Sequence, residues 1–219
     1  MWCVGRLTAE YRRCMYELLD LYARPYRAKQ PVICIDEKSK QLLRHSRHPL
    51  PLAPGKPARV DYEYVRAGTC NIFVAVEPRG GQRVVQVTAR RGKVDFIDFA
   101  QYLIRRVYRS AHRIHFVVDN LNIHFKKCFV ETLGPAAAER LLRRVVFHYT
   151  PKHASWLNMA EIEIAALGRQ CLNRRIGDRA TIEREVTAWQ QRRNAEHRTI
   201  EWTFTRQLAD QKLGDHYVS

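Results

Sequence analysis

The sequence lacks the patterns that mark several common classes of protein. No apolar run approaches the roughly 20 residues that a membrane-spanning helix needs, and the first residues show no secretory signal pattern. Gly80 and Gly81 belong to no GxGxxG motif and no helix follows them directly, which excludes a dinucleotide-binding loop at this point. These absences favour a cytoplasmic protein.

Paired cysteines are also missing. None of the six cysteines forms a CxxC motif, and they are scattered through apolar patterns. We therefore predict buried free thiols in a reducing cytoplasm rather than disulfides or zinc ligands. His112 and His115 form an HxxH motif without a third ligand, so zinc is not predicted there either. The cysteines are Cys3, Cys14, Cys34, Cys70, Cys128 and Cys171.

Acidic residues are scarce relative to basic ones. Lys plus Arg number 38 against 22 for Asp plus Glu, which gives a formal net charge of +16. This excess favours a polyanionic partner, most simply nucleic acid, and less strongly a membrane surface; the alternative is a basic but merely solvated surface.

The acids are missing altogether from residues 38–60, where prolines also exclude a long helix. We interpret this stretch as an extended basic loop suited to phosphate contacts. The alternative is a mobile surface loop. Its basic residues are Lys38, Lys40, Arg44, Arg47, Lys56 and Arg59.

What is present indicates an α/β protein with a substantial core, since 46% of the 219 residues are apolar. The Gly80-Gly81 turn between two apolar runs predicts an antiparallel hairpin. Strands are predicted at 32–36, 62–65, 69–77, 83–89, 114–118 and 145–149. Helices are predicted within 1–31 and at 94–109, 123–132, 136–144, 158–174 and 181–196.

Two apolar strands end in an aspartate. Residues 32–35 form an unbroken apolar run before Asp36, which is typical of a central parallel strand covered on both faces, and residues 114–118 lead in the same way into Asp119. Either aspartate alone could simply start a turn or cap a helix. Adjacent parallel strands, however, would place both carboxylates on one rim, where a shared Mg²⁺ or Mn²⁺ would relieve their repulsion.

Glu161 is the candidate for a third acid. At 100° per residue it falls inside the apolar stripe of the predicted 158–174 helix, and Glu163 points away from it. An ionised glutamate on such a stripe is costly unless it is paired or coordinated. Asn158 and Glu161 also fit a capping box, and the spacing alone does not separate a cap from a metal ligand.

The order of these elements resembles an RNase H-like catalytic core, with a mixed five-stranded sheet flanked by helices. The words CIDEKS, PGKPAR, DYEYVRAGTCNIFVAVEP, VVDNLNIH and YTPKHASWLNMAEIEI resemble the transposases of bacterial insertion sequences in the mariner-like superfamily, in the insertion sequence 630 branch. The resemblance runs from about residue 9 to about residue 213. It divides the chain into a helical lead-in (1–31), a catalytic core (32–178) and a helical extension of the same domain (179–219).

The resemblance implies an enzyme with a DDE triad of Asp36, Asp119 and Glu161. Such enzymes cut and rejoin DNA by two-metal phosphoryl transfer with Mg²⁺, for which Mn²⁺ can substitute. The implied partners are double-stranded transposon ends and a TA target, with a homodimer in the active complex. Residues next to the triad are candidate contacts to DNA, or else ordinary loop packing: Lys38, His124, Lys152, His153 and Trp156.

One feature departs from this family. Its members carry helix-turn-helix modules before the core, whereas only about 30 residues precede Asp36 here. We therefore expect a catalytic half, either from a split reading frame or from a truncated remnant. The alternatives are a catalytically incomplete DNA-binding remnant and an RNase H-like nuclease that cuts without joining.

Overall fold

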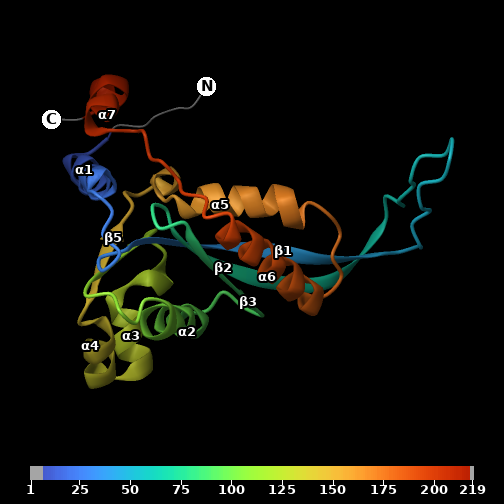
Figure 1. The fold of residues 1–219 in the computed structure, drawn as a ribbon, viewed down its shortest axis with the longest axis horizontal. Coiled ribbons are helices and arrows are strands. Elements are labelled where there is room, and N and C mark those ends of the chain that lie inside the picture. The colour runs from blue at the N-terminus through green and yellow to red at the C-terminus, as the bar shows by residue number, and fades with distance from the viewer. Residues whose placement is uncertain (1–6, 218–219) are drawn as a thin grey trace.

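The computed structural model describes residues 7–217, which fold around a five-stranded mixed sheet in the order β3-β2-β1-β4-β5 (Figure 1). Strands β1, β2 and β3 are antiparallel, whereas β1, β4 and β5 run parallel. The predicted mixed sheet of five strands flanked by helices is confirmed. The strands are β1 (Val32–His45), β2 (Tyr64–Glu77), β3 (Gln82–Thr88), β4 (Ile114–Val118) and β5 (Val145–Tyr149).

The helices largely follow the predicted segments, but two of them end in wider π-helical turns, Leu103–Val107 after α2 and Gly168–Leu172 after α5. Asp178 caps α6 by accepting a hydrogen bond from the backbone N–H of Thr181 at 2.8 Å. The helices are α1 (Ala9–Ala23), α2 (Lys93–Tyr102), α3 (Lys126–Leu133), α4 (Pro135–Leu142), α5 (Ala160–Leu167), α6 (Arg179–Ala195) and α7 (Arg206–Leu213). Helix α7 was not predicted as a separate element.

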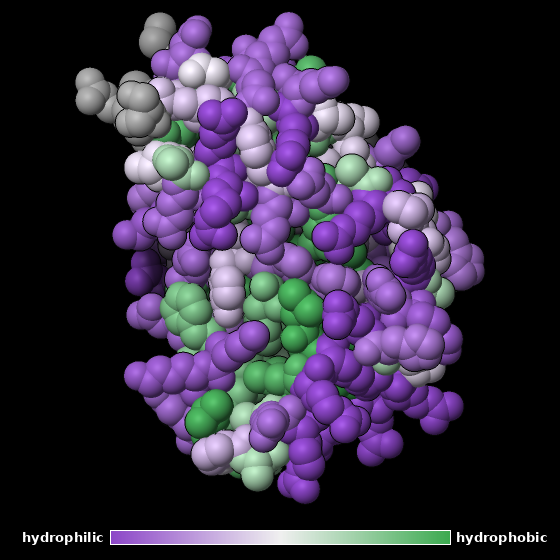
Figure 2. All heavy atoms as spheres, turned by 90° about the vertical axis from the view of Figure 1, so that its left-hand side faces the viewer, coloured by the Kyte–Doolittle hydropathy of each residue, from purple (hydrophilic) through white to green (hydrophobic). Residues whose placement is uncertain are grey.

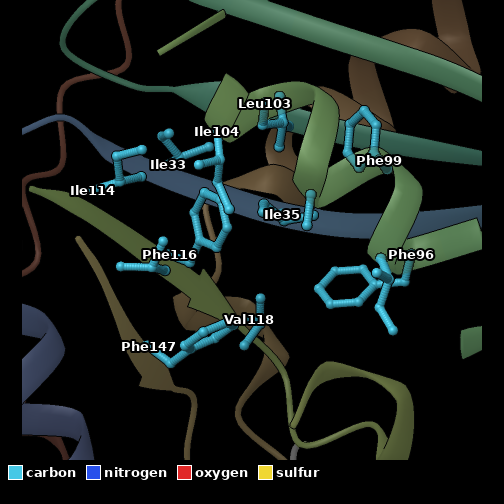
Figure 3. Packing of buried hydrophobic residues seen from close by; sticks show 14 of the residues in the cluster. Ile33, Ile35, Phe96, Phe99, Leu103, Ile104, Ile114, Phe116, Val118 and Phe147 are labelled. Carbon is cyan, nitrogen blue, oxygen red and sulfur yellow. The ribbon is translucent and has the colours of Figure 1, made fainter. Parts of the chain in front are cut away.

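The two faces of the sheet carry different helices. Ile33, Ile35 and Phe116 point to the face covered by α2, α3 and α4 (Figure 3). Cys34 and Val117 alternate with them and point to the face covered by α1 and the start of α5, while the far part of that face lies under α5 and α6. The unbroken apolar start of β1 is therefore buried on both sides, as predicted.

The predicted 38–60 loop is wrong in its first third. Strand β1 continues to His45 and pairs with β2 along its whole second half, so the predicted strand at 62–65 is the beginning of β2. Backbone pairing with β2 makes this stretch a strand, with an irregularity at Leu42, although its polar side chains do not indicate one in the sequence. Beyond it, residues 46–63 form a projecting arm whose strands meet through isolated bridges such as Leu50 to Arg59 (Figure 1). We call residues 46–63 the basic arm.

The predictions about free cysteines and about membrane-spanning helices can be compared with the described residues. Cys14, Cys34, Cys70, Cys128 and Cys171 are free, and all except Cys14 are buried; Cys3 lies outside the described residues. Among residues 7–217, no helix is both long and apolar enough to cross a membrane. The face drawn in Figure 2 is mostly hydrophilic, with apolar side chains gathered in its lower half.

Candidate active site

The register of two parallel strands brings Asp36 and Asp119 side by side. Val32 pairs with His115 and Cys34 with Val117, so continuing the register by two residues sets Asp36 opposite Asp119. Both carboxylates share the face of Cys34 and Val117, because side chains alternate along a strand. One detail of the prediction is wrong: Asp36 does not end its strand, since β1 continues to His45 and only the parallel pairing stops near Asp36.

Asp36 is buried and held by two neighbours. Its Oδ1 accepts the backbone N–H of Glu37 at 2.8 Å, and Asn158 Nδ2 lies 3.4 Å from Oδ2 while donating to the carbonyl of Ile35 at 2.9 Å. Burial and the negative charges of Glu161, Glu37 and Asp119 together raise the pKa of Asp36 to about 7, against the lowering effect of that N–H. The site is therefore a concentration of negative charge.

The capping-box interpretation of Glu161 is wrong. The backbone N–H of Asn158 donates to Ser155 O at 2.7 Å, and Asn158 Oδ1 accepts from Ala160 N at 3.2 Å. Asn158 thus ties the start of α5 to β1 with its own side chain and leaves Glu161 uninvolved. Glu161 is exposed, and it lies near enough to Asp36 for its charge to raise the pKa of that residue.

The predicted orientation of α5 is also wrong, because the buried glutamate is Glu163. Its Oε1 accepts from Arg83 Nη2 at 2.8 Å and from Arg193 Nη2 at 2.7 Å, and Glu163 is completely inaccessible to solvent. Burial alone would raise the pKa of Glu163, but the two guanidinium groups outweigh it and lower the pKa. Glu163 joins α5 to β3 and α6 through these two ion pairs, so its carboxylate is engaged inside the protein.

Sequence reasoning predicted His124 as a DNA contact but missed that its imidazole is buried between two carboxylates. His124 Nδ1 lies 2.7 Å from Asp119 Oδ1, and His124 Nε2 lies 3.3 Å from Glu37 Oε2 without hydrogen-bond alignment. Burial would lower the pKa of His124, but the two carboxylates raise it to about 9, and His124 in turn holds the pKa of Asp119 below its usual value despite burial. The only sequence signal was the acid Glu37 directly after Asp36.

The donor chemistry at this rim suits a hard divalent cation, since Asp36, Asp119 and Glu161 offer carboxylate oxygens. Asp119 Oδ1 is occupied by His124 and by the N–H of Leu121 at 3.1 Å, which leaves Oδ2 without a hydrogen bond in the described part of the chain. Within residues 7–217, no three His, Cys, Asp or Glu side chains lie close enough together to hold an ion. The three carboxylates are therefore suitable ligands for such a cation, but their side chains do not meet at one point in the described residues.

Most of the predicted DNA contacts are exposed, with Arg47 paired to Asp61 at 3.4 Å and Trp156 packed edge-on against Phe204. Lys56 and Arg59 lie on the basic arm and Lys152 and His153 in the loop before α5. The exposed candidates are Arg44, Arg47, Lys56, Arg59, Lys152, His153 and Trp156.

The remaining three candidates are covered. Lys38 is half-buried, and Lys40 Nζ donates to the carbonyls of Leu172 at 2.7 Å and Arg174 at 3.1 Å, so its ammonium closes the end of the α5 segment. His124 is fully buried under Phe96. Its enclosure, and the internal task of Lys40, argue against the predicted contacts of these two residues with DNA.

Comparison with known proteins places this arrangement in a family. A model described as DDE superfamily endonuclease matches residues 31–183. The fold is similar to the Mos1 mariner paired-end complex with Mn (TM-score 0.56, 16% identity, covering 90% of this chain and 61% of that one) and to the Mos1 strand transfer complex (TM-score 0.54, 16% identity, 90% and 62%).

The likeness extends to the whole chain in the Mos1 paired-end complex with Mg (TM-score 0.51, 15% identity, covering 100% of this chain and 68% of that one). No curated protein matches the sequence. The chain spans about three fifths of the length of the Mos1 chain with the TM-score of 0.56. These structures show the predicted RNase H-like fold, and the match over most of its length shows that this chain belongs to the DDE superfamily endonuclease family.

Proposed function

We propose that this chain is the catalytic part of a transposase of the insertion sequence 630 branch, with residues 32–178 as its core. It would cleave DNA phosphodiesters at the ends of an insertion sequence and transfer the strands to a TA target. The observation that carries the proposal is the adjacency of Asp36 and Asp119 across β1 and β4, with Glu161 close enough to act on Asp36.

The concentration of carboxylates supports a role for divalent cations. Asp36, Asp119 and Glu161 would hold them, and oxygens of the bound DNA phosphates would complete the ligand set that the free protein leaves open. When bound, such ions activate an attacking water or 3′-hydroxyl and stabilise the leaving oxygen. His124 holds Oδ1 of Asp119 in place and offsets its negative charge. Asn158 holds Asp36 in position.

The charge distribution supports double-stranded DNA as the partner. The net charge is +16, and the basic arm carries exposed Arg47, Lys56 and Arg59. Such residues neutralise phosphates without reading sequence. The solved Mos1 chains were crystallised as paired-end and strand transfer complexes, which supports a homodimer acting on two DNA ends. A DNA partner would place the protein with the nucleoid.

The direct test is nicking of supercoiled plasmid with Mg²⁺ or Mn²⁺. Wild-type protein should nick, and Asp119→Asn should not. Strand transfer from pre-cleaved ends then distinguishes a transposase from a nuclease that only cuts. Metal-independent nicking, or nicking retained by Asp119→Asn, would overturn the proposal.

A second candidate is a DNA-binding remnant without catalysis, which the unconverged acids favour. Calorimetric titration of Mn²⁺ in the presence of DNA separates the two. The catalytic proposal expects Asp36→Asn and Glu161→Gln to lose binding, whereas a remnant should bind DNA with no Mn²⁺ uptake that depends on these acids.

A further inference from the structure

A hollow lies on the same side of the sheet as Cys34 and Val117, four residues earlier along β1 and β4 than Asp36 and Asp119. It has a volume of about 320 Å³ and is formed by the end of α1, the segment that follows it, the start of β1, the turn between β2 and β3, and the stretch around Trp202. This volume is in the range of small-molecule sites. Met159 forms part of its wall and stands two residues before Glu161, so the hollow borders the junction that leads into α5.

The walls combine aromatic rings with apolar side chains. The rings of Tyr22 and Trp202 lie 5.4 Å apart, and Val32 and Ile200 add apolar surface. Trp202 Nε1 is buried, yet in residues 7–217 nothing accepts its hydrogen bond. Because this N–H has almost no accessible surface, a ligand in the hollow would meet the ring of Trp202 rather than its N–H.

A chain of hydrogen bonds prepares an acceptor on the opposite wall. Glu17 Oε1 lies 2.8 Å from His148 Nδ1, and His148 Nε2 lies 2.9 Å from His115 Nδ1. The carboxylate requires the proton on His148 Nδ1, which makes His148 Nε2 an acceptor and requires the proton on His115 Nδ1. His115 Nε2 then carries a lone pair and can accept a hydrogen bond. His115 lines the hollow, and its Nε2 has no hydrogen-bond partner in the described residues.

The ionisation of the pair agrees with this assignment. Burial, helped by the neighbouring His148 and Arg24, lowers the pKa of His115 to about 4, and burial lowers that of His148. Both rings are therefore neutral near pH 7, which agrees with the assignment of one ring proton to each histidine.

The mouth of the hollow is positive. Arg24, Arg27 and Arg79 line it, all three are exposed, and none forms an ion pair with another described residue. Glu77 is the one acidic residue of the lining. Exposed arginines next to aromatic rings are a suitable binding surface for a phosphate joined to a flat ring.

We propose that this hollow binds a nucleotide. Its base would lie against Tyr22 and Trp202, with its edge bonded to His115 Nε2, and its phosphate would meet the arginines at the mouth. A base edge offers the N–H donor that the lone pair of His115 Nε2 needs. The nucleotide is either free or an unpaired residue of single-stranded DNA, since both present the same chemistry. The site is separate from the carboxylates, so it does not depend on catalysis.

Calorimetry with the full chain in EDTA tests the proposal without any metal chemistry. The probes are dTMP, dAMP, deoxyribose 5-phosphate and a single-stranded thymidine decamer. Trp202→Leu, which removes the aromatic ring from the wall, should weaken nucleotide binding about fivefold. Arg24→Glu should weaken it about tenfold or more. Arg106→Glu, an exposed arginine elsewhere, is the control for overall charge, and Arg79→Glu replaces Arg24→Glu if that variant melts below the assay temperature.

The source of the nucleotide follows from which probe responds. Free nucleotide is indicated if the variants weaken dTMP or dAMP but leave the decamer unchanged; a strand is indicated if they weaken the decamer. The proposal is overturned if neither probe loses more affinity in the site variants than in Arg106→Glu. It is equally overturned if deoxyribose 5-phosphate binds as tightly as dTMP, because then the base is not recognised.

Discussion

His124 stands between two acids that come from different strands and different faces of the sheet: its Nδ1 is 2.7 Å from Asp119 Oδ1 and its Nε2 is 3.3 Å from Glu37 Oε2. Glu37 follows Asp36 directly, so side-chain alternation sends it to the opposite face, under α2. The imidazole therefore links the position of one candidate metal ligand to the buried neighbour of the other.

This link should appear as an interaction energy. Glu37→Gln and His124→Gln each leave a buried charge without its partner and are expected to lower the free energy of unfolding by about 3 kcal/mol. The double variant should lose less than the sum, with a coupling of about 1 to 3 kcal/mol, measured by urea unfolding. Lys93→Gln with Glu131→Gln, an exposed pair 2.7 Å apart, is the matched control and should show almost no coupling. Additive effects at His124 would refute the link.

Two glutamates on one helix should separate stability from activity. Glu163→Gln removes the partner of two arginines at a fully buried position and should cost about 3 kcal/mol of unfolding free energy. Glu161→Gln is exposed and should change stability by less than about 0.5 kcal/mol while abolishing metal-dependent nicking. Thermal unfolding and the plasmid assay measure both. Loss of nicking in Glu163→Gln with a normal melting temperature would contradict these assignments.

The same ion pairs should give a defined acid dependence. The pKa of Glu163 is lowered from 4.5 in the folded protein, so its contribution is fully present above about pH 4.5 and is lost as the pH falls through the folded value. The stability difference between wild type and Glu163→Gln should thus be constant from about pH 5 to 7 and shrink below about pH 4.5. Urea unfolding at each pH measures it. A difference that grows on acidification would show that Glu163 is not the group responsible.

The basic arm should contribute to DNA affinity through charge alone. Replacing Lys56 and Arg59, which are exposed and in no ion pair with described residues, by glutamine should reduce the slope of log affinity against log salt by about 2. Fluorescence anisotropy on duplexes of unrelated sequence should give the same reduction for each. Arg105→Gln with Arg106→Gln is the control pair on α2's π-helical end. An equal loss of slope in the control would show that the arm has no special role.

Local sequence patterns were sufficient to predict the two central parallel strands of the sheet. The strand pair ending near Asp36 and Asp119 follows from two apolar runs, because only burial on both faces explains consecutive apolar residues before an acid. The hairpin of β2 and β3 and the positions of the main helices follow from turn residues and periodicity in the same way. The family resemblance and the excess of positive charge also needed no coordinates.

Tertiary structure decided which way side chains face where periodicity was ambiguous. Helix α5 is apolar on several sides, so the spacing of its residues did not set its rotation; Arg83 and Arg193, distant in sequence, draw Glu163 inward and turn Glu161 outward. His124 was predicted to contact DNA because it lies near Asp119 in the sequence, but the 3₁₀ turn Asn122–His124 folds it under the sheet against Glu37. Long-range ion pairs have no local signature, and they alone determined these orientations.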